Sequence, residues 1–201
     1  MSNSVSTMFV FALVGAITPG PVNLLAIRHG TARNISLPLL FVLGASVSYT
    51  AVVWLMGTGA QHFLNQPALM TLTQWLGSGY LLYLAWRIAM APTNPLDTRV
   101  SSNDSSAWNG FVQGVASQIL NPKAWLVALS GVSLFVLKSD QADAALAGFC
   151  GISLMTCLLG VGCWTVLGRL LTRWLASPTR QLWFHRLLAT ILVLTVVRMT
   201  V

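Results

Sequence analysis

Acidic residues are almost absent from this sequence of 201 residues. Only 7% of the residues are charged, and Asp and Glu together number 4. These are Asp97, Asp104, Asp140 and Asp143, all between the long apolar runs. An enzyme built inside apolar segments needs a nucleophile with a base, or a metal, within them. The runs hold no carboxylate, and the three histidines lie near their ends, so the sequence argues against an enzyme; the histidines are His29, His62 and His185.

Cysteines are also few, and their spacing indicates no site. Cys150, Cys157 and Cys163 lie in one apolar stretch, without a CxxC pair and without a neighbouring histidine cluster. Neither a disulfide framework nor a metal centre is indicated by this spacing. We therefore interpret the three cysteines as small packing residues, and we expect no metal and no cofactor.

What the chain has in abundance is apolar side chains. It is 55% hydrophobic with a mean hydropathy of +0.73, which is typical of an integral membrane protein in contact with lipid. The net charge is +7, but the basic residues are spread over short segments between the apolar runs rather than along one polar face. We therefore expect no nucleic-acid partner.

Six apolar stretches reach the length of about 20 residues that a membrane-spanning helix needs. They are Val5–Ile27, Leu37–Ala60, Leu69–Met90, Gly110–Leu137, Ala144–Leu167 and Leu182–Val201. The last is the weakest, because His185, Arg186 and Arg198 leave it a short uncharged middle. The sequence predicts an all-α integral membrane protein with six transmembrane helices.

The distribution of basic residues predicts the orientation in the membrane. With the N-terminus outside, eight of them face the cytoplasm: Arg28, Arg33, Arg87, Arg99, Arg169, Arg173, Arg180 and Arg186. The opposite side holds Lys138 and Arg198 alone. Because cytoplasmic loops carry the excess of Lys and Arg, both termini are predicted to lie outside.

A segment rich in Pro, Ser, Asn and Asp, residues 92–109, divides the chain into two parts. We interpret it as a cytoplasmic linker between a first three-helix repeat, residues 1–91, and a second, residues 110–201, within one transmembrane domain. Three spans is an odd number, so related halves would be inverted, as in many secondary transporters. Glycines at 110, 114, 148 and 151 offer close-packing faces, either inside the monomer or in a homo-oligomer.

Proline interrupts the first helix of each half, at Thr18-Pro19-Gly20-Pro21 and at Asn121-Pro122-Lys123. Proline removes an N–H group and clashes with the preceding turn, and glycine bends without steric cost. A lone proline would be a simple kink. Two matched ones favour a pair of opposed breaks, whose freed carbonyls suit a cation and whose following half-helices suit an anion. Such a pair could hold a zwitterion.

Polar side chains gather beside these breaks, where they are costly in hydrocarbon unless they face a cavity or a partner. The predicted substrate-binding residues are Thr18, Pro19, Gly20, Pro21, Asn23, Gln118, Asn121, Pro122 and Lys123. Lys123 is the strongest indication of a binding site among them, because no predicted span offers it a carboxylate. It either awaits a substrate carboxylate or extends to the headgroups, a long reach from the middle of its span.

The run Thr18-Pro19-Gly20-Pro21-Val22-Asn23 with Arg28-His29-Gly30, the run from Gln118 to Ala124, and Gly79–Arg87 together resemble the LysE/RhtB family of bacterial amino-acid exporters. The likeness covers the whole chain. The family's commoner pattern has Asn where Val22 stands, which leaves Asn23 as the nearby amide.

This resemblance implies a multi-pass protein of the bacterial inner membrane that exports amino acids or close derivatives by antiport with protons, through alternating access. The stretches Leu82–Thr93 and "VVRMTV" look most like the branch that exports cysteine and O-acetylserine, with homoserine or threonine as other neutral substrates. The alternatives are a channel or a structural membrane subunit, and least of all a membrane-embedded enzyme.

Overall fold

The computed structural model describes residues 2–32, 34–60, 107–171 and 174–200, together with isolated positions between 75 and 90. The third predicted span, Leu69–Met90, and the predicted linker up to residue 106 lie wholly or largely outside the described residues. Outside them also lie Arg33, His62, Arg87, Asp97, Arg99, Asp104 and Arg173. The described part is helical and contains no strand, which confirms the predicted all-α class.

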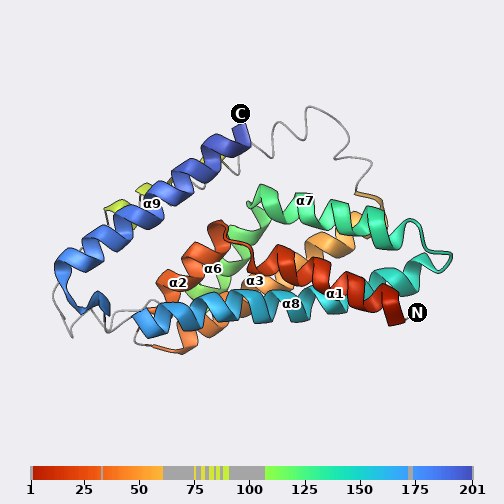
Figure 1. Cartoon of the computed structure of the whole chain (residues 1–201), viewed down its shortest axis with the longest axis horizontal. Helices are drawn as coiled ribbons and strands as arrows, with labels where there is room; N and C mark the ends of the chain where they lie inside the picture. Colours follow the sequence, from red (N-terminus) through yellow and green to blue (C-terminus); the bar gives the residue numbers. More distant parts are fainter. Residues whose placement is uncertain are drawn as a thin grey trace.

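Seven α-helices follow one another in the described part of the chain. They are α1 (Ser2–Ile17), α2 (Pro21–Gly30), α3 (Ser36–Leu55), α6 (Ala107–Ile119), α7 (Pro122–Gly131), α8 (Ala142–Leu171) and α9 (Pro178–Thr200). Two short π-helical turns, Met56–Ala60 and Val132–Val136, extend α3 and α7, and a 3-10 turn, Trp174–Ala176, precedes α9. The bundle gathers α1, α2, α3, α6, α7 and α8, and α9 runs along its side (Figure 1).

Two of these helices are long and apolar enough to cross a membrane by themselves: Ser36–Gly59, with 24 residues, and Ala142–Leu171, with 30. Two bent pairs raise the number of candidate spans to as many as four. The first pair joins Val5–Ile17 to Pro21–Gly30, and the second joins Ala107–Ile119 to Pro122–Val136. Helix α9 covers the predicted sixth span but is not among these candidate spans. The six-span arrangement of two inverted repeats therefore stays a prediction.

The predicted break in the first helix of each half is present. Pro21 is the first residue of α2 and Pro122 is the first residue of α7. Proline suits this first position, because its fixed φ fits a helix and its missing N–H would have no partner there. The two pairs bend by 66° and 64°, so the two breaks turn the chain by nearly the same angle.

Helices of the two predicted halves interlock through glycine. A Cβ added at Gly44 of α3 would collide with the carbonyl oxygen of Phe111 in α6. One added at Gly168 of α8 would collide with that of Ile27 in α2. Small residues let helix backbones approach this closely in membranes. Each long helix therefore packs on the broken helix of the other half, and the halves are not two separate bodies.

The predicted close-packing glycines divide into two kinds. Gly110 and Gly114 lie in α6 with their α-carbons against backbone atoms of α3, so these two serve the inside of the chain. A Cβ added at Gly148 or Gly151 of α8 would meet no described atom within 4 Å. These two stay candidates for contact with a second copy or with residues outside the described part.

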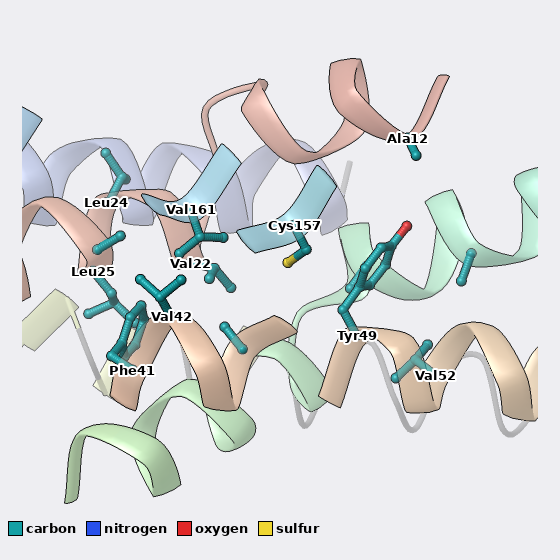
Figure 2. Close-up of a cluster of buried hydrophobic side chains, with 14 of the residues drawn as sticks. Ala12, Val22, Leu24, Leu25, Phe41, Val42, Tyr49, Val52, Cys157 and Val161 are labelled. Atoms are coloured by element: carbon teal, nitrogen blue, oxygen red, sulfur yellow. The ribbon is translucent and has the colours of Figure 1, made fainter. Parts of the chain in front are cut away.

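The core is apolar and so is much of the outside. Phe41 and Phe149 are fully buried. The labelled core side chains of Figure 2 include residues of α2, α3 and α8. Large side chains on the outer faces, such as Trp54 and Met155, are more than half exposed at 56% and 57%. An exposed apolar surface of this extent is expected where lipid covers the protein.

Candidate functional site

At the first break, a buried asparagine holds the end of α1 against the start of α2. The side-chain amide of Asn23 donates hydrogen bonds to the carbonyl oxygens of Ala16 and Thr18, both at 2.9 Å. The Thr18 hydroxyl donates to the carbonyl of Val14 at 2.5 Å. The break leaves the carbonyls of Ala16 and Thr18 without a helical partner, and Asn23 bonds both of them, because an unpaired buried carbonyl is costly. The side chain of Asn23 therefore stabilises the bend between α1 and α2.

Indole groups cap both broken helices at the same place. Trp164 of α8 donates from its ring N–H to the carbonyl of Ile17, the last residue of α1, at 3.0 Å. Trp125 of α7 donates in the same way to Ile119, the last residue of α6, at 2.6 Å. These bonds satisfy carbonyls that a helix end leaves without a partner. The two breaks therefore share their bend and the treatment of their carbonyl ends.

The amide ends of the two breaks differ. Asn121 caps α7, since its side-chain oxygen accepts from the N–H of Lys123 at 3.2 Å and its carbonyl accepts from Ala124 at 2.9 Å. The residue before α2 is Gly20, which has no side chain to cap with. Within the described ranges, no acceptor is found for the N–H groups of Val22 and Asn23.

Lys123 connects one break to the other. Its ammonium donates to the carbonyl oxygen of Thr18 at 2.7 Å. The side chain is half-buried, and it forms no ion pair with any residue that the structure describes. The ammonium is therefore held at the first break by a neutral carbonyl, which is a weaker partner for a cation than a carboxylate.

A small cavity lies between the breaks. Of the predicted substrate-binding residues, five line it: Gly20, Asn23, Gln118, Asn121 and Lys123. Thr18 takes part through its carbonyl bond to Lys123, while Pro19, Pro21 and Pro122 are not in the lining. The volume is about 30 Å³, enough for one or two water molecules and too small for an amino acid. A substrate can enter only after the surrounding helices separate.

Among the lining residues that the sequence did not predict, two have side chains with a polar group, Tyr49 of α3 and Cys157 of α8. Both are buried, and in Figure 2 the Tyr49 ring extends toward Ala12 of α1 with Cys157 nearby. The sequence feature that could have indicated Tyr49 is its position after Ser46 and Ser48, which form an unusually polar run for a membrane helix. Nothing in the sequence distinguished Cys157 from the other two cysteines.

Gln118 is the most deeply buried polar side chain of the predicted set after Asn23 and Asn121. It is 6% exposed, and its amide nitrogen lies 4.0 Å from the sulfur of Cys157. Its side-chain oxygen has no hydrogen-bond partner among the described residues. Buried acceptors are normally satisfied, so an open one in a cavity marks a place where a donor can bind.

In the part of the chain that is described, no group of three or more His, Cys, Asp or Glu side chains comes together. The arrangement instead offers a positive group, an open helix N-terminus and an open acceptor around one cavity. These are the groups that bind the two charged ends of a small zwitterion.

Comparison with known proteins agrees with the whole-chain resemblance. Residues 13–201 match the family described as LysE type translocator. A protein named cysteine/O-acetylserine efflux protein from Salmonella paratyphi A is 32% identical over 197 residues, which cover 96% of this chain and 95% of the relative. Its namesake from Escherichia coli strain K12 is 31% identical over 194 residues, with the same shares covered, 96% and 95%. No solved structure gives a significant match.

Proposed function

The chain belongs to the LysE type translocator family of amino-acid exporters, which are multi-pass proteins of the inner membrane, and we propose that it exports small neutral amino acids. Cysteine and O-acetylserine are the first substrates to test, because they stand in the names of the relatives from Salmonella and Escherichia. The binding roles of the residues around the two breaks belong to this proposal.

The observation that carries the proposal is the position of Lys123. Its ammonium rests on the Thr18 carbonyl beside a cavity that both breaks line. A lysine in a membrane segment is costly and typically marks a substrate or ion pathway. The carboxylate of an amino acid would give it the charged partner that the described residues lack. The charges around the cavity therefore suit a zwitterion better than an apolar solute.

Alternating access would move the substrate across the membrane. The cavity is too small for an amino acid, so opening must separate helices on one side at a time. The interlocked glycine contacts between α3 and α6, and between α2 and α8, favour these cross-half pairs as the moving units. The two breaks, where the backbone already bends, are the hinges of this proposed motion.

The proposed orientation places both termini outside and the loop after α2 in the cytoplasm. The guanidinium of Arg169, near the end of α8, donates to the carbonyl of Ala32 at 2.5 Å. The end of α8 and the loop after α2, both predicted cytoplasmic from their basic residues, therefore lie on the same side of the bundle. Proton-driven antiport completes the proposal, as the resemblance to the family implies.

Counterflow in proteoliposomes tests the function. Vesicles loaded with unlabelled O-acetylserine or cysteine and diluted into labelled substrate should accumulate label transiently, and an imposed proton gradient should accelerate uptake or release according to its sign. A channel would only dissipate the gradient, and a structural subunit would do neither. Absence of counterflow with every small neutral amino acid would overturn the proposal.

A further inference from the structure

The two half-helices that follow the breaks differ in whether their first amide groups already have hydrogen-bond acceptors. Helix α7 begins with its first amide groups already bonded by Asn121, through a side-chain oxygen and a carbonyl. Helix α2, with 10 residues, begins after Gly20, and the N–H groups of Val22 and Asn23 have no acceptor among the described residues. Both of these residues line the cavity. Of the two half-helices, α2 alone has first-turn amide donors without an acceptor among the described residues, and they belong to residues that line the cavity.

The lysine of the other half lies over this open end. A Cβ placed on Gly20 would be 3.4 Å from the ammonium nitrogen of Lys123. The partial positive charge of a helix N-terminus and a full ammonium charge therefore converge on one point. Two positive groups brought together, with no anion beside them among the described residues, destabilise the empty site and favour a bound carboxylate.

The ammonium group of an amino acid needs a hydrogen-bond acceptor, and Gln118 offers one. Its side-chain oxygen is buried, lines the same cavity and has no partner within the described residues. A carbonyl oxygen accepts hydrogen bonds, and an ammonium group donates three. This open acceptor is independent of the helix end, since it lies on α6 and is 6% exposed.

We propose that these groups form a site that orients an α-amino acid in one direction, and this rests on the proposed function. The substrate carboxylate accepts from the N–H groups of Val22 and Asn23 and replaces the Thr18 carbonyl as the partner of Lys123. The substrate ammonium donates to the side-chain oxygen of Gln118. The substrate class is therefore a small α-amino acid with both ends free, and the N-terminus of α7 takes no part.

Installing a cap on α2 tests the carboxylate end. Gly20→Asn gives α2 the same cap that Asn121 gives α7, so its side chain competes with the substrate for the two amides. The backbone of Gly20 is extended, with φ of −166°, so a side chain is tolerated there. We expect the KM for counterflow to rise roughly tenfold, because the charged carboxylate of the substrate loses one hydrogen bond. The midpoint of thermal unfolding should stay level or rise.

Gly20→Ala is the matched variant, because it adds the same Cβ without a cap and so measures the steric part alone. Gly20→Ser supplies a shorter cap and replaces Gly20→Asn if that variant does not fold. A capped α2 with the KM of wild type would overturn the assignment of the carboxylate.

Two isomers test the ammonium end. O-acetylserine has a free ammonium and N-acetylserine does not, although both have the same atoms and the same carboxylate. In mildly acidic buffer, where the acetyl group does not migrate, wild type should prefer the former in competition with labelled substrate. Gln118→Leu should lower that preference roughly tenfold, and Gln118→Glu, which keeps an acceptor, should retain it.

These experiments distinguish failure of the proposed function from failure of the oriented site. If wild type shows counterflow with no small neutral amino acid, the proposed function fails, and the oriented site fails with it. If export is intact and Gln118→Leu keeps the preference of wild type for the free ammonium, the oriented site alone is overturned.

Discussion

The ammonium of Lys123 donates to the carbonyl oxygen of Thr18 at 2.7 Å, although the two residues are 105 positions apart in the chain. Each belongs to a broken helix, so this one bond ties the two breaks together. A substrate carboxylate would compete for the same ammonium, so under the proposed function binding of the substrate would release this bond. We therefore propose that the contact links occupancy of the cavity to the freedom of the two hinges.

Asn23 supports the first break, and its loss should destabilise the protein. Asn23→Leu removes both bonds to the carbonyls of Ala16 and Thr18 and leaves those acceptors without a donor from this side chain. We expect a loss of about 2–4 kcal/mol in the free energy of unfolding, from two hydrogen bonds at a buried position. The measurement is thermal or denaturant unfolding in detergent. Stability equal to that of wild type would show that the amide does not hold the break.

Pro21 tests whether the break is used in turnover. Pro21→Ala returns an N–H group at the first position of α2 and relaxes the fixed φ, so the helix can straighten. We expect a turnover rate several-fold below that of wild type with a smaller change in KM. Pro178→Ala is the matched control, because Pro178 also begins a helix, α9, away from the cavity. Wild-type turnover in Pro21→Ala would reduce the break to a simple kink.

The interlocking of the two halves is testable at glycine. Gly114→Ala places a methyl group against the backbone of Phe41, and Gly168→Ala places one against Ile27. Overpacking of this kind costs about 1–3 kcal/mol, and we expect a matching fall in the midpoint of thermal unfolding. Gly148→Ala, which meets no described atom within 4 Å, should change it little. Equal effects at all three positions would contradict the packing described above.

Cys157 reports on the opening of the cavity. Its side chain is 2% exposed and lines a cavity of about 30 Å³, which excludes a maleimide. In a Cys150→Ser, Cys163→Ser background, we expect labelling of Cys157 to be slow and to change in rate when substrate is added, because labelling requires the open state. Mass spectrometry of the intact protein measures it. Rapid labelling that substrate does not change would mean that the cavity is permanently open, and it would contradict an opening coupled to transport.

The sequence predicts what depends on local chemistry. Proline at 21 and 122 prescribes the two bends, and long apolar runs prescribe α3 and α8, so these features are read directly from residue types. The polar side chains beside the breaks could also be named, because hydrocarbon makes each of them costly. Gly20, Asn23, Gln118, Asn121 and Lys123 lie together in the lining of one cavity, and their role in substrate binding stays a prediction.

Long-range geometry was beyond the reach of the sequence. The pattern gives Asn23 and Asn121 the same chemistry, yet Asn121 caps the helix that follows it and Asn23 bonds backwards to the helix before it. That difference depends on the three-dimensional course of the chain. The contribution of Tyr49 and the packing of α8 on α2 depend in the same way on which helices meet, and hydrophobic runs do not specify their neighbours.

The central claim is that Lys123 binds the substrate carboxylate. The direct measurement is substrate counterflow in proteoliposomes that hold equal amounts of wild type, Lys123→Met, Lys123→Arg and Lys138→Met, the last of which alters the chain's other lysine, exposed and outside the cavity. We predict a roughly hundredfold loss of kcat/KM for Lys123→Met, from truncating one partner of a charge pair, and an intermediate loss for Lys123→Arg. Wild-type counterflow and unchanged proton dependence in Lys123→Met would contradict the account.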